Sequence, residues 1–354
     1  MMKELLLRDY RPITRLRLEE HCPGRPKYPA IDGHAHFGRL GLGEHYEEAY
    51  DTGEAVAAYR ELGIERAVNL DGESGPYLDR MLKKMEGYED FFILFGNVEV
   101  ERLDDAGFDG YVYRTLCESK RKGVRGLKFW KNLSLGILDQ TGSYIPLNDR
   151  RLSPVWQYAA QLGMPVLLHV GDPEAFFSPV TPQNERYEEL QAHPEWSFCR
   201  EGLYSFEELM EQQEQMVADN PETVFIIAHF GSWAENLKEV ARWMDTYPNF
   251  NVDIAERIAE LGRQPYSSRR FFEKYSDRII FGTDSMPGHM LQRINYRFLE
   301  TEDEYFDYSY EGVPPQGRWK IYGLGLQDSV LEKIYSKNIQ RILSWPCTTG
   351  QKVL

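Results

Sequence analysis

The stretch Pro29–Gly38, PAIDGHAHFG, places two histidines two positions apart at the end of a short apolar run. Side chains two positions apart in a β-strand point to the same face, so His34 and His36 can direct both imidazoles toward one point in space. Two neutral imidazole nitrogens that converge in this way indicate a metal ion. The alternative is a pair of surface histidines at a strand end, and the rest of the chain decides between the two.

Seven further apolar runs rich in Val, Ile, Leu and Phe follow the first one along the chain. Most are near-continuous rather than alternating, which is typical of parallel strands that are covered on both faces. Helical patterns separate the runs, and several of these begin at Ser, Thr, Asp or Pro and stop at Gly or Asn. The seven runs are Arg66–Gly72, Phe91–Val100, Gly123–Trp130, Met164–Gly171, Thr223–Gly231, Asn249–Ala255 and Asp277–Asp284.

Eight strands that alternate with eight helices indicate an α/β fold of parallel βα units. An open doubly wound sheet could also hold eight strands. A (β/α)₈ TIM barrel explains more, because its catalytic groups come from the C-terminal ends of many different strands. We therefore predict an N-terminal extension over residues 1–28 and a single barrel domain over residues 29–354, with long loops after strand five (Pro173–Gly202) and strand eight (Ser285–Gly325).

Composition narrows the class of ligand. The chain has 354 residues, of which 42% are apolar and 27% charged, as in an ordinary globular protein. Its formal net charge of −15 argues against nucleic acid and against an anionic membrane surface as partners, because both would require a basic patch. A small-molecule substrate is the expected ligand, and homodimer formation is left open.

The cysteines and the apolar runs predict a cytoplasmic protein. No run approaches the ~20 apolar residues that a transmembrane helix requires, and the three-leucine run near the N-terminus is too short for a signal peptide. The four cysteines show no Cys-x-x-Cys spacing, so neither a disulfide framework nor a structural zinc motif is indicated. They are Cys22, Cys117, Cys199 and Cys347.

Rare polar residues fall at the ends of the predicted strands. Four of the eight histidines stand there, together with an aspartate after strand eight and a lysine in strand four: His34, His36, His169, His229, Asp284 and Lys128. The histidines at positions 21, 45 and 193 lack such a context and are interpreted as surface residues. Imidazole and carboxylate ligands suit Zn²⁺, Mn²⁺ or Fe²⁺, and such an ion can activate a water molecule at neutral pH for hydrolysis.

The combination of His34-x-His36, His169, His229 and the Gly-Thr-Asp ending at Asp284 resembles the amidohydrolase superfamily. Within it, the chain is most similar to the amidohydrolase-2 group, a set of (β/α)₈ enzymes that includes decarboxylases, hydratases and lactonases. The resemblance implies that His34, His36, His169 and Asp284 bind one divalent ion, Zn²⁺ in the first instance and Mn²⁺ or Fe²⁺ as alternatives. It also implies that Asp284 shuttles protons to and from the metal-activated water.

The resemblance leaves the roles of other residues open. His229 is either a further ligand or, as we prefer, a group that orients the water or polarises the substrate carbonyl. Lys128 either binds substrate or developing negative charge, bridges two metal ions as a carboxylated lysine, or pairs with an acid. Trp130 shares the strand parity of Lys128 and is a candidate for an apolar wall. Further substrate candidates are Arg257 or its neighbours Asp253 and Glu256 after strand seven, and His289 and Arg293 after strand eight.

The sequence therefore predicts a metal-dependent hydrolase that uses a metal-activated water to attack an amide, ester or lactone of a small molecule. The first alternative is a metal-dependent decarboxylase or hydratase of the same group, in which Asp284 handles proton transfer to or from carbon. The second is a catalytically silent barrel that only binds a ligand. The presence of all five core site residues argues against this last interpretation.

Overall fold

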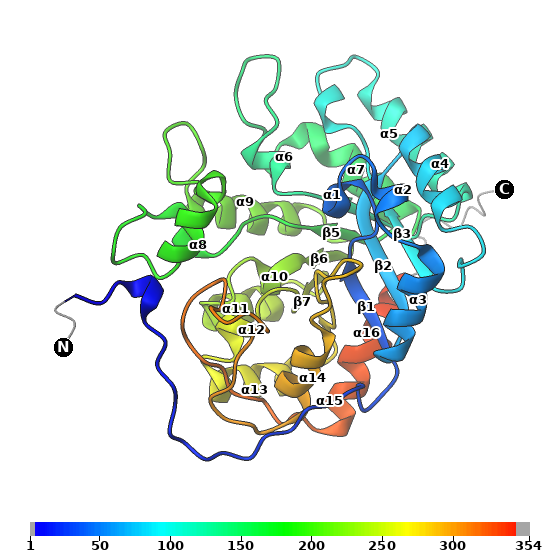
Figure 1. Ribbon diagram of the computed structural model, residues 1–354. Helices are drawn as coiled ribbons and strands as arrows, with labels where there is room; N and C mark the ends of the chain where they lie inside the picture. Colours follow the sequence, from blue (N-terminus) through cyan, green and yellow to red (C-terminus); the bar gives the residue numbers. More distant parts are fainter. Residues whose placement is uncertain (1–3, 345–354) are drawn as a thin grey trace.

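Eight parallel β-strands pair in chain order from β1 to β8 and form the wall of a barrel (Figure 1). The computed structural model describes residues 4–344. Helices surround the strands on the outside, so the predicted (β/α)₈ barrel is confirmed. The strands are β1 (Ala30–Ala35), β2 (Ile64–Glu73), β3 (Phe92–Gly96), β4 (Gly126–Phe129), β5 (Val166–Leu168), β6 (Phe225–Ile227), β7 (Phe250–Asp253) and β8 (Ile279–Ile280).

Eight helical segments match the patterns in the sequence and cover the outside of the barrel (Figure 1). They are α3 (Thr52–Glu61), α4 (Gly75–Lys84), α5 (Phe108–Arg121), α7 (Ser153–Gln161), α9 (Phe206–Asp219), α11 (Leu237–Thr246), α13 (Pro265–Lys274) and a last segment. The last segment consists of α15 (Asp328–Glu332), a π-helical turn (Lys333–Lys337) and α16 (Asn338–Leu343).

Shorter helices lie in the connections between these elements. They are α1 (Arg39–Leu42), α2 (Tyr46–Ala49), α6 (Asn132–Leu135), α8 (Tyr187–Ala192), α10 (Ala228–Gly231), α12 (Ile258–Leu261) and α14 (Gln292–Glu300). Single 3₁₀ turns span Leu7–Asp9, Val100–Arg102, Arg150–Leu152, Glu174–Phe177 and Pro194–Trp196. Several of these elements belong to the loops that build the site.

The barrel closes between β8 and β1, although β8 is only two residues long. The Gly33 amide donates to the Phe281 carbonyl at 2.8 Å, and the His36 amide donates to the Ser285 carbonyl at 2.9 Å. These bonds extend the contact beyond β8 toward the carboxyl end of the barrel. The sequence predicted that the eighth strand extends to Asp284, whereas β8 itself is only two residues long. The residues that follow β8 nevertheless run beside β1.

Asp32 fastens this seam from inside. It is fully buried, and its carboxylate accepts hydrogen bonds from the Thr283 hydroxyl at 2.6 Å and from the Thr283 amide at 3.1 Å. The same carboxylate accepts the His34 amide at 3.2 Å. Burial raises the pKa of Asp32 to about 6. One side chain thus joins the two backbone segments that carry His34 and Asp284.

Both predicted long loops contain structure of their own. The loop after β5 holds the 3₁₀ turn Glu174–Phe177, helix α8 and the turn Pro194–Trp196. The loop after β8 holds α14 and an antiparallel bridge between Phe306 and Ile321. Both loops line the cavity described below, as expected for connections at the carboxyl ends of barrel strands.

The N-terminal extension runs outside the helices as an extended chain with a single 3₁₀ turn (Figure 1). It is attached to the loop after β8, because His21 Nδ1 lies 2.5 Å from Asp303 Oδ1 and the Arg318 guanidinium donates to the Tyr10 carbonyl at 2.6 Å. Among residues 4–344, no helix combines the length and the apolar character needed to cross a bilayer.

Gly282 is predicted to be essential for close packing at the seam. A Cβ atom there would lie 2.8 Å from the Cβ of His34, so we expect Gly282→Ala to lower the free energy of unfolding by about 1–3 kcal/mol. Urea unfolding followed by circular dichroism measures this change. Gly312→Ala is the matched control, because its Cβ would meet nothing within 4 Å. Equal stability of the two variants would contradict the prediction.

Candidate active site

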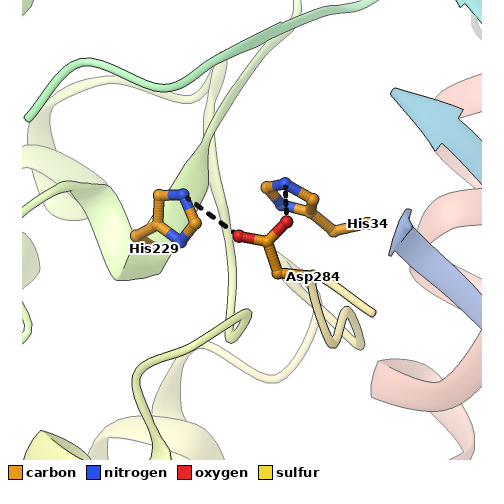
Figure 2. Close-up of side chains that lie close together, drawn as sticks. All are labelled: His34, His229 and Asp284. Carbon is orange, nitrogen blue, oxygen red and sulfur yellow. Dashed lines mark ion pairs between the residues drawn. The ribbon is translucent and has the colours of Figure 1, made fainter. Parts of the chain in front are cut away.

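The carboxylate of Asp284 lies at the centre of the histidines predicted to form the site. Its Oδ1 atom is 2.9 Å from His36 Nε2 and 3.4 Å from His34 Nε2. Its Oδ2 atom is 3.9 Å from His229 Nε2. Figure 2 shows His34 and His229 on either side of this carboxylate. One ligand atom each from His34, His229 and Asp284 lie within 4.8 Å of one another, which is close enough to bind a single ion.

Asp253, at the end of β7, orients two of these histidines. Its Oδ2 atom lies 2.8 Å from His34 Nδ1, and its Oδ1 atom accepts the backbone amide of His229 at 2.9 Å. An ionised carboxylate can only accept, so the His34 proton resides on Nδ1 and its Nε2 lone pair faces Asp284. His34 Nε2 is buried and has no hydrogen-bond partner among the described residues.

The protons of His229 and His169 are fixed in the same way. His229 Nδ1 lies 2.9 Å from the carbonyl oxygen of Ala255, which can only accept, so its Nε2 carries a lone pair. His169 Nε2 lies 3.2 Å from the Asp172 carboxylate, whose other oxygen pairs with Lys131. The His169 proton is therefore on Nε2, and its Nδ1 lone pair points at His229 Nε2 across 3.3 Å.

This arrangement fits a bound cation. Two nitrogen lone pairs that face each other at 3.3 Å repel, since neither can donate to the other while both protons are held elsewhere. The unpartnered lone pair of His34 and the carboxylate of Asp284 face the same region. Neutral imidazoles and one carboxylate form a ligand set suited to a divalent transition metal.

The protonation states agree with this donor set. Burial lowers the pKa of His34 and of His229, and it lowers the pKa of His169 to about 4. Burial alone would raise the pKa of Asp284, but the imidazoles of His34 and His36 hold it well below its usual value. At neutral pH the three histidines are thus neutral and Asp284 is ionised.

Three residues that follow strand ends have a left-handed backbone conformation, which sets the direction of their side chains. The φ angles are 57° at His229, 53° at Glu256 and 59° at Asp284. Each costs a residue with a side chain about 1–3 kcal/mol, so the surrounding structure must hold these conformations in place. The apolar run predicted that the strand continues through His229. Instead, β6 ends before this residue, and His229 lies in the single turn of α10, whose interior residues have left-handed backbone angles.

Lys128 is in β4 and is fully buried. Its Nζ atom has no hydrogen-bond partner among the described residues and sits 4.4 Å from the centre of the Trp130 ring. Burial lowers the pKa of Lys128 to about 8. The Trp130 ring also packs beside His36, with the ring centres 5.1 Å apart. Trp130 therefore contacts both Lys128 and His36, and neither Lys128 nor Trp130 is among the residues that line the cavity described below.

A cavity of about 690 Å³ opens above the site. Asp284, His229 and His169 lie at its floor, and the two long loops supply much of its wall. Members of the wall include Phe176, Arg186, His193, Trp196, Glu256, Arg257, Met286, His289, Val313, Pro314, Pro315 and Gln316. Of the predicted substrate residues, Arg257 and His289 belong to this wall. His193, interpreted as a surface residue, also belongs to this wall, and its side chain is 45% exposed.

Arg293 is not part of this cavity. It lines a separate cavity of about 580 Å³ between the N-terminal extension and the loop after β8. The preceding residue of α14, Gln292, points inward and donates to the Asp32 carboxylate at 3.3 Å. Successive helical residues point in different directions, so Arg293 is turned toward the outside. The placement does not support the predicted substrate contact.

Two functional partners were missed or misjudged from the sequence. Asp253 was considered only as a possible substrate contact, whereas it orients His34 and His229. Asp172 was not considered, although it follows His169 by three positions and holds its proton. For Asp172 the available signal was its position three residues after a strand-end histidine, whereas Asp253 has no histidine near it in the sequence.

The chain belongs to the amidohydrolase family, whose model matches residues 31–345. Members of this family are metal-dependent enzymes, and the expected superfamily is thereby confirmed. No curated protein matches the chain. Zinc as the bound metal and a cytoplasmic location stay predictions.

Similar solved structures share the barrel at low identity. A dihydroxybenzoic acid decarboxylase from Polaromonas sp. JS666, with manganese and 2-nitroresorcinol bound, is 12% identical with a TM-score of 0.55, over 89% of this chain and 96% of that one. A 2,6-dihydroxybenzoate decarboxylase complexed with 2,6-dihydroxybenzoate is 16% identical, with a TM-score of 0.52 over 89% and 97%. The 4-oxalomesaconate hydratase from Rhodopseudomonas palustris is 13% identical, with a TM-score of 0.50 over 89% and 95%.

Replacing His34 and His36 together by Ala is expected to abolish binding of a divalent metal while the fold remains intact. Two of the inward-facing imidazoles are then lost, and the barrel wall keeps its backbone bonds. Elemental analysis of the untagged protein measures bound metal, and circular dichroism measures the fold. The double variant His21→Ala, His45→Ala removes two exposed histidines and is the control. Full metal occupancy in the first variant would refute the interpretation of the opening motif.

Asp253→Asn is expected to weaken metal binding by about 10–100-fold, because the residue that fixes the His34 proton on Nδ1 is lost. An amide that donates to Nδ1 would move the proton to Nε2 and direct it into the site. Competition with a chelating dye measures the dissociation constant of Zn²⁺. Unchanged affinity in a folded variant would show that Asp253 does not orient the ligand.

Proposed function

We propose that this chain is a divalent-metal-dependent hydrolase that cleaves an amide, ester or lactone of a small molecule. The observation that carries the proposal is the carboxylate of Asp284 amid three imidazoles at the floor of a cavity of about 690 Å³. A carboxylate in this position can exchange protons with a water molecule and with a substrate. The size of the cavity suits a small organic molecule.

The proposed ligands are His34, His36, His169 and Asp284, and Zn²⁺ suits their predominantly imidazole character. When bound, the ion would polarise the substrate carbonyl and lower the pKa of a water molecule toward neutrality. The unpartnered lone pairs of His34 and His169 support this assignment. The compact cluster adds His229 as a possible further donor.

Asp284 is the proposed proton carrier. Its side chain is 24% exposed, whereas that of His34 is only 1% exposed, so Asp284 is accessible from the cavity. Its low pKa keeps it ionised and ready to accept a proton from the attacking water. After the attack, the protonated carboxyl can release that proton into the cavity.

His229 orients the water in this proposal. Because its proton is held by the Ala255 carbonyl, Nε2 can accept a hydrogen bond but cannot donate one to a carbonyl oxygen. Between the two roles considered for this residue outside metal binding, the tautomer favours water orientation. Lys128 contributes a buried positive charge behind Asp284 and Asp253 rather than a direct substrate contact.

A second candidate function is decarboxylation or hydration of a carboxylated small molecule. Arg257 favours it, because this residue is only 5% exposed and lines the same cavity as Asp284. A buried arginine at this place can bind a substrate carboxylate. Solved structures of similar fold include two named decarboxylases and a named hydratase.

Oxygen-isotope labelling separates hydrolysis from decarboxylation, and hydration would differ from both by placing ¹⁸O in a new hydroxyl group without cleaving the substrate. The Zn²⁺-loaded protein is incubated in H₂¹⁸O with a panel of esters, lactones and amides, and with 2,6-dihydroxybenzoate. Hydrolysis is expected to place one ¹⁸O atom in the product carboxylate, detected by mass spectrometry, whereas a decarboxylase would release CO₂ without labelling the organic product. Protein treated with a chelator is the control. Turnover of the dihydroxybenzoate alone would replace the hydrolase proposal with the second candidate.

Asp284→Asn is expected to lower kcat by about 10²–10⁴-fold, because the amide cannot carry the proton. Steady-state kinetics on the best member of the panel measures this loss, and elemental analysis shows whether metal is retained. Asp307→Asn changes an exposed aspartate in the same loop and serves as the control. Near-normal turnover by Asp284→Asn would remove Asp284 from the mechanism.

A further inference from the structure

We propose that Glu256 is a second catalytic carboxyl group, which donates a proton to the leaving group while Asp284 accepts the proton of the attacking water. This inference rests on the hydrolase function proposed above and adds a residue to its mechanism. It comes from the position, the contacts and the surroundings of Glu256 in the cavity wall.

Glu256 is placed for contact with a substrate. It follows β7 by three residues and lines the same cavity as His229 and Asp284. Its backbone has the left-handed φ of 53°, which is unfavourable for a glutamate and must be held by the surrounding structure. Conformations of this kind cluster where a side chain has to be aimed. Glu256 thus lines the cavity from a third strand end.

One oxygen of Glu256 is held and the other is free. Gln316, from the loop after β8, donates from Nε2 to Glu256 Oε2 at 3.0 Å. Among residues 4–344 no hydrogen bond or ion pair ends on Glu256 Oε1. The neighbouring Arg257 donates from Nη1 to the backbone carbonyl of Glu256 at 2.7 Å, not to its carboxylate. The carboxyl group is therefore oriented but not neutralised by a cation.

The surrounding charges favour the protonated form of this carboxyl. Burial and the nearby Asp284 raise the pKa of Glu256 to about 7, against the opposing effect of Arg257. Glu260 and Glu189 are the other charged groups that act on it, and both raise the pKa. A carboxyl that keeps its proton at neutral pH in the cavity that also holds Asp284 is suited to act as an acid.

The proposed step balances as follows. Water transfers a proton to Asp284, and its oxygen forms a bond to the substrate carbonyl carbon. The bond from this carbon to the leaving group then breaks, and the leaving oxygen or nitrogen takes the proton from Glu256 Oε1. The proton on Asp284 passes through solvent in the cavity to the Glu256 carboxylate. Water is consumed, an acid and an alcohol or amine are formed, and both side chains return to their starting states.

The leaving group provides the test. A 4-nitrophenolate departs as an anion and needs no acid, whereas an ethoxide must be protonated as it leaves. In the Zn²⁺-loaded protein, Glu256→Gln is therefore expected to lower kcat/KM for ethyl benzoate by about 10²–10⁴-fold and to change that for 4-nitrophenyl benzoate only a few-fold. Glu195→Gln changes an exposed glutamate that is outside the cavity lining but next to Trp196 of its wall, and is the matched control.

The outcomes separate the acid role from a structural one. If Glu256→Gln slows both esters equally, Glu256 serves only to hold Gln316 and its loop, and the proposal is overturned. Gln316→Ala keeps the carboxyl and is expected to slow both esters by the same factor. If the wild-type protein hydrolyses neither ester nor any other member of the panel, the proposed hydrolase function fails instead.

A second measurement does not depend on turnover. Burial raises the pKa of Glu235 to about 7 as well as that of Glu256. Carbon-13 NMR of protein labelled at the glutamate carboxyl carbons is therefore expected to show two resonances that titrate near pH 7, of which the one from Glu256 disappears in Glu256→Gln. Because the pKa of Glu256 is raised in the folded protein, its carboxyl stays protonated until the pH exceeds that raised pKa. Titration of the Glu256 resonance at the ordinary glutamate value would overturn the acid role whether or not a substrate is known.

Discussion

The hydrogen bonds of Asp253 are the constraint on which the rest of the site depends. One carboxylate at the end of β7 fixes the imidazole of His34 from β1 and the backbone of His229 after β6. It thereby sets both the direction of one ring and the unusual backbone conformation of another residue. Its own burial is complete, so these partners are its compensation for the loss of water. Without Asp253, nothing would fix the His34 ring and the His229 backbone so that their nitrogen lone pairs face the same region.

Oxygen acceptors around the site decide where each proton resides. The carbonyl of Ala255 and the carboxylates of Asp253 and Asp172 each bind one imidazole N–H, which leaves the opposite nitrogen as an acceptor or ligand. A site built this way cannot relieve the repulsion among its lone pairs by moving a proton. A cation between the lone pairs would offset this repulsion, and the acceptors behind each ring keep the nitrogens directed toward it.

The sequence predicted the barrel and the central residues because both depend on local patterns. Apolar runs gave the strands, and rare residue types at strand ends gave His34, His36, His169, His229 and Asp284. The tautomer of His229 could not be predicted from the sequence, because it depends on a backbone carbonyl at the end of the neighbouring strand. Arg293 was misjudged because α14 was not predicted, and without the phase of that helix the direction of its side chains is unknown.

The barrel wall carries the proposed ligands, whereas the two long loops form much of the cavity wall. This separation affects how the specificity of such a protein can change during evolution. The proposed ligands lie at strand ends and at the seam, while Phe176, Trp196, His289 and Gln316 stand on connections that no strand ladder constrains. Mutations, insertions and deletions in these loops can reshape the chamber and leave the chemistry at its floor untouched. Over evolutionary time, new specificities can therefore arise by drift in two surface segments, at little risk to the reactive centre.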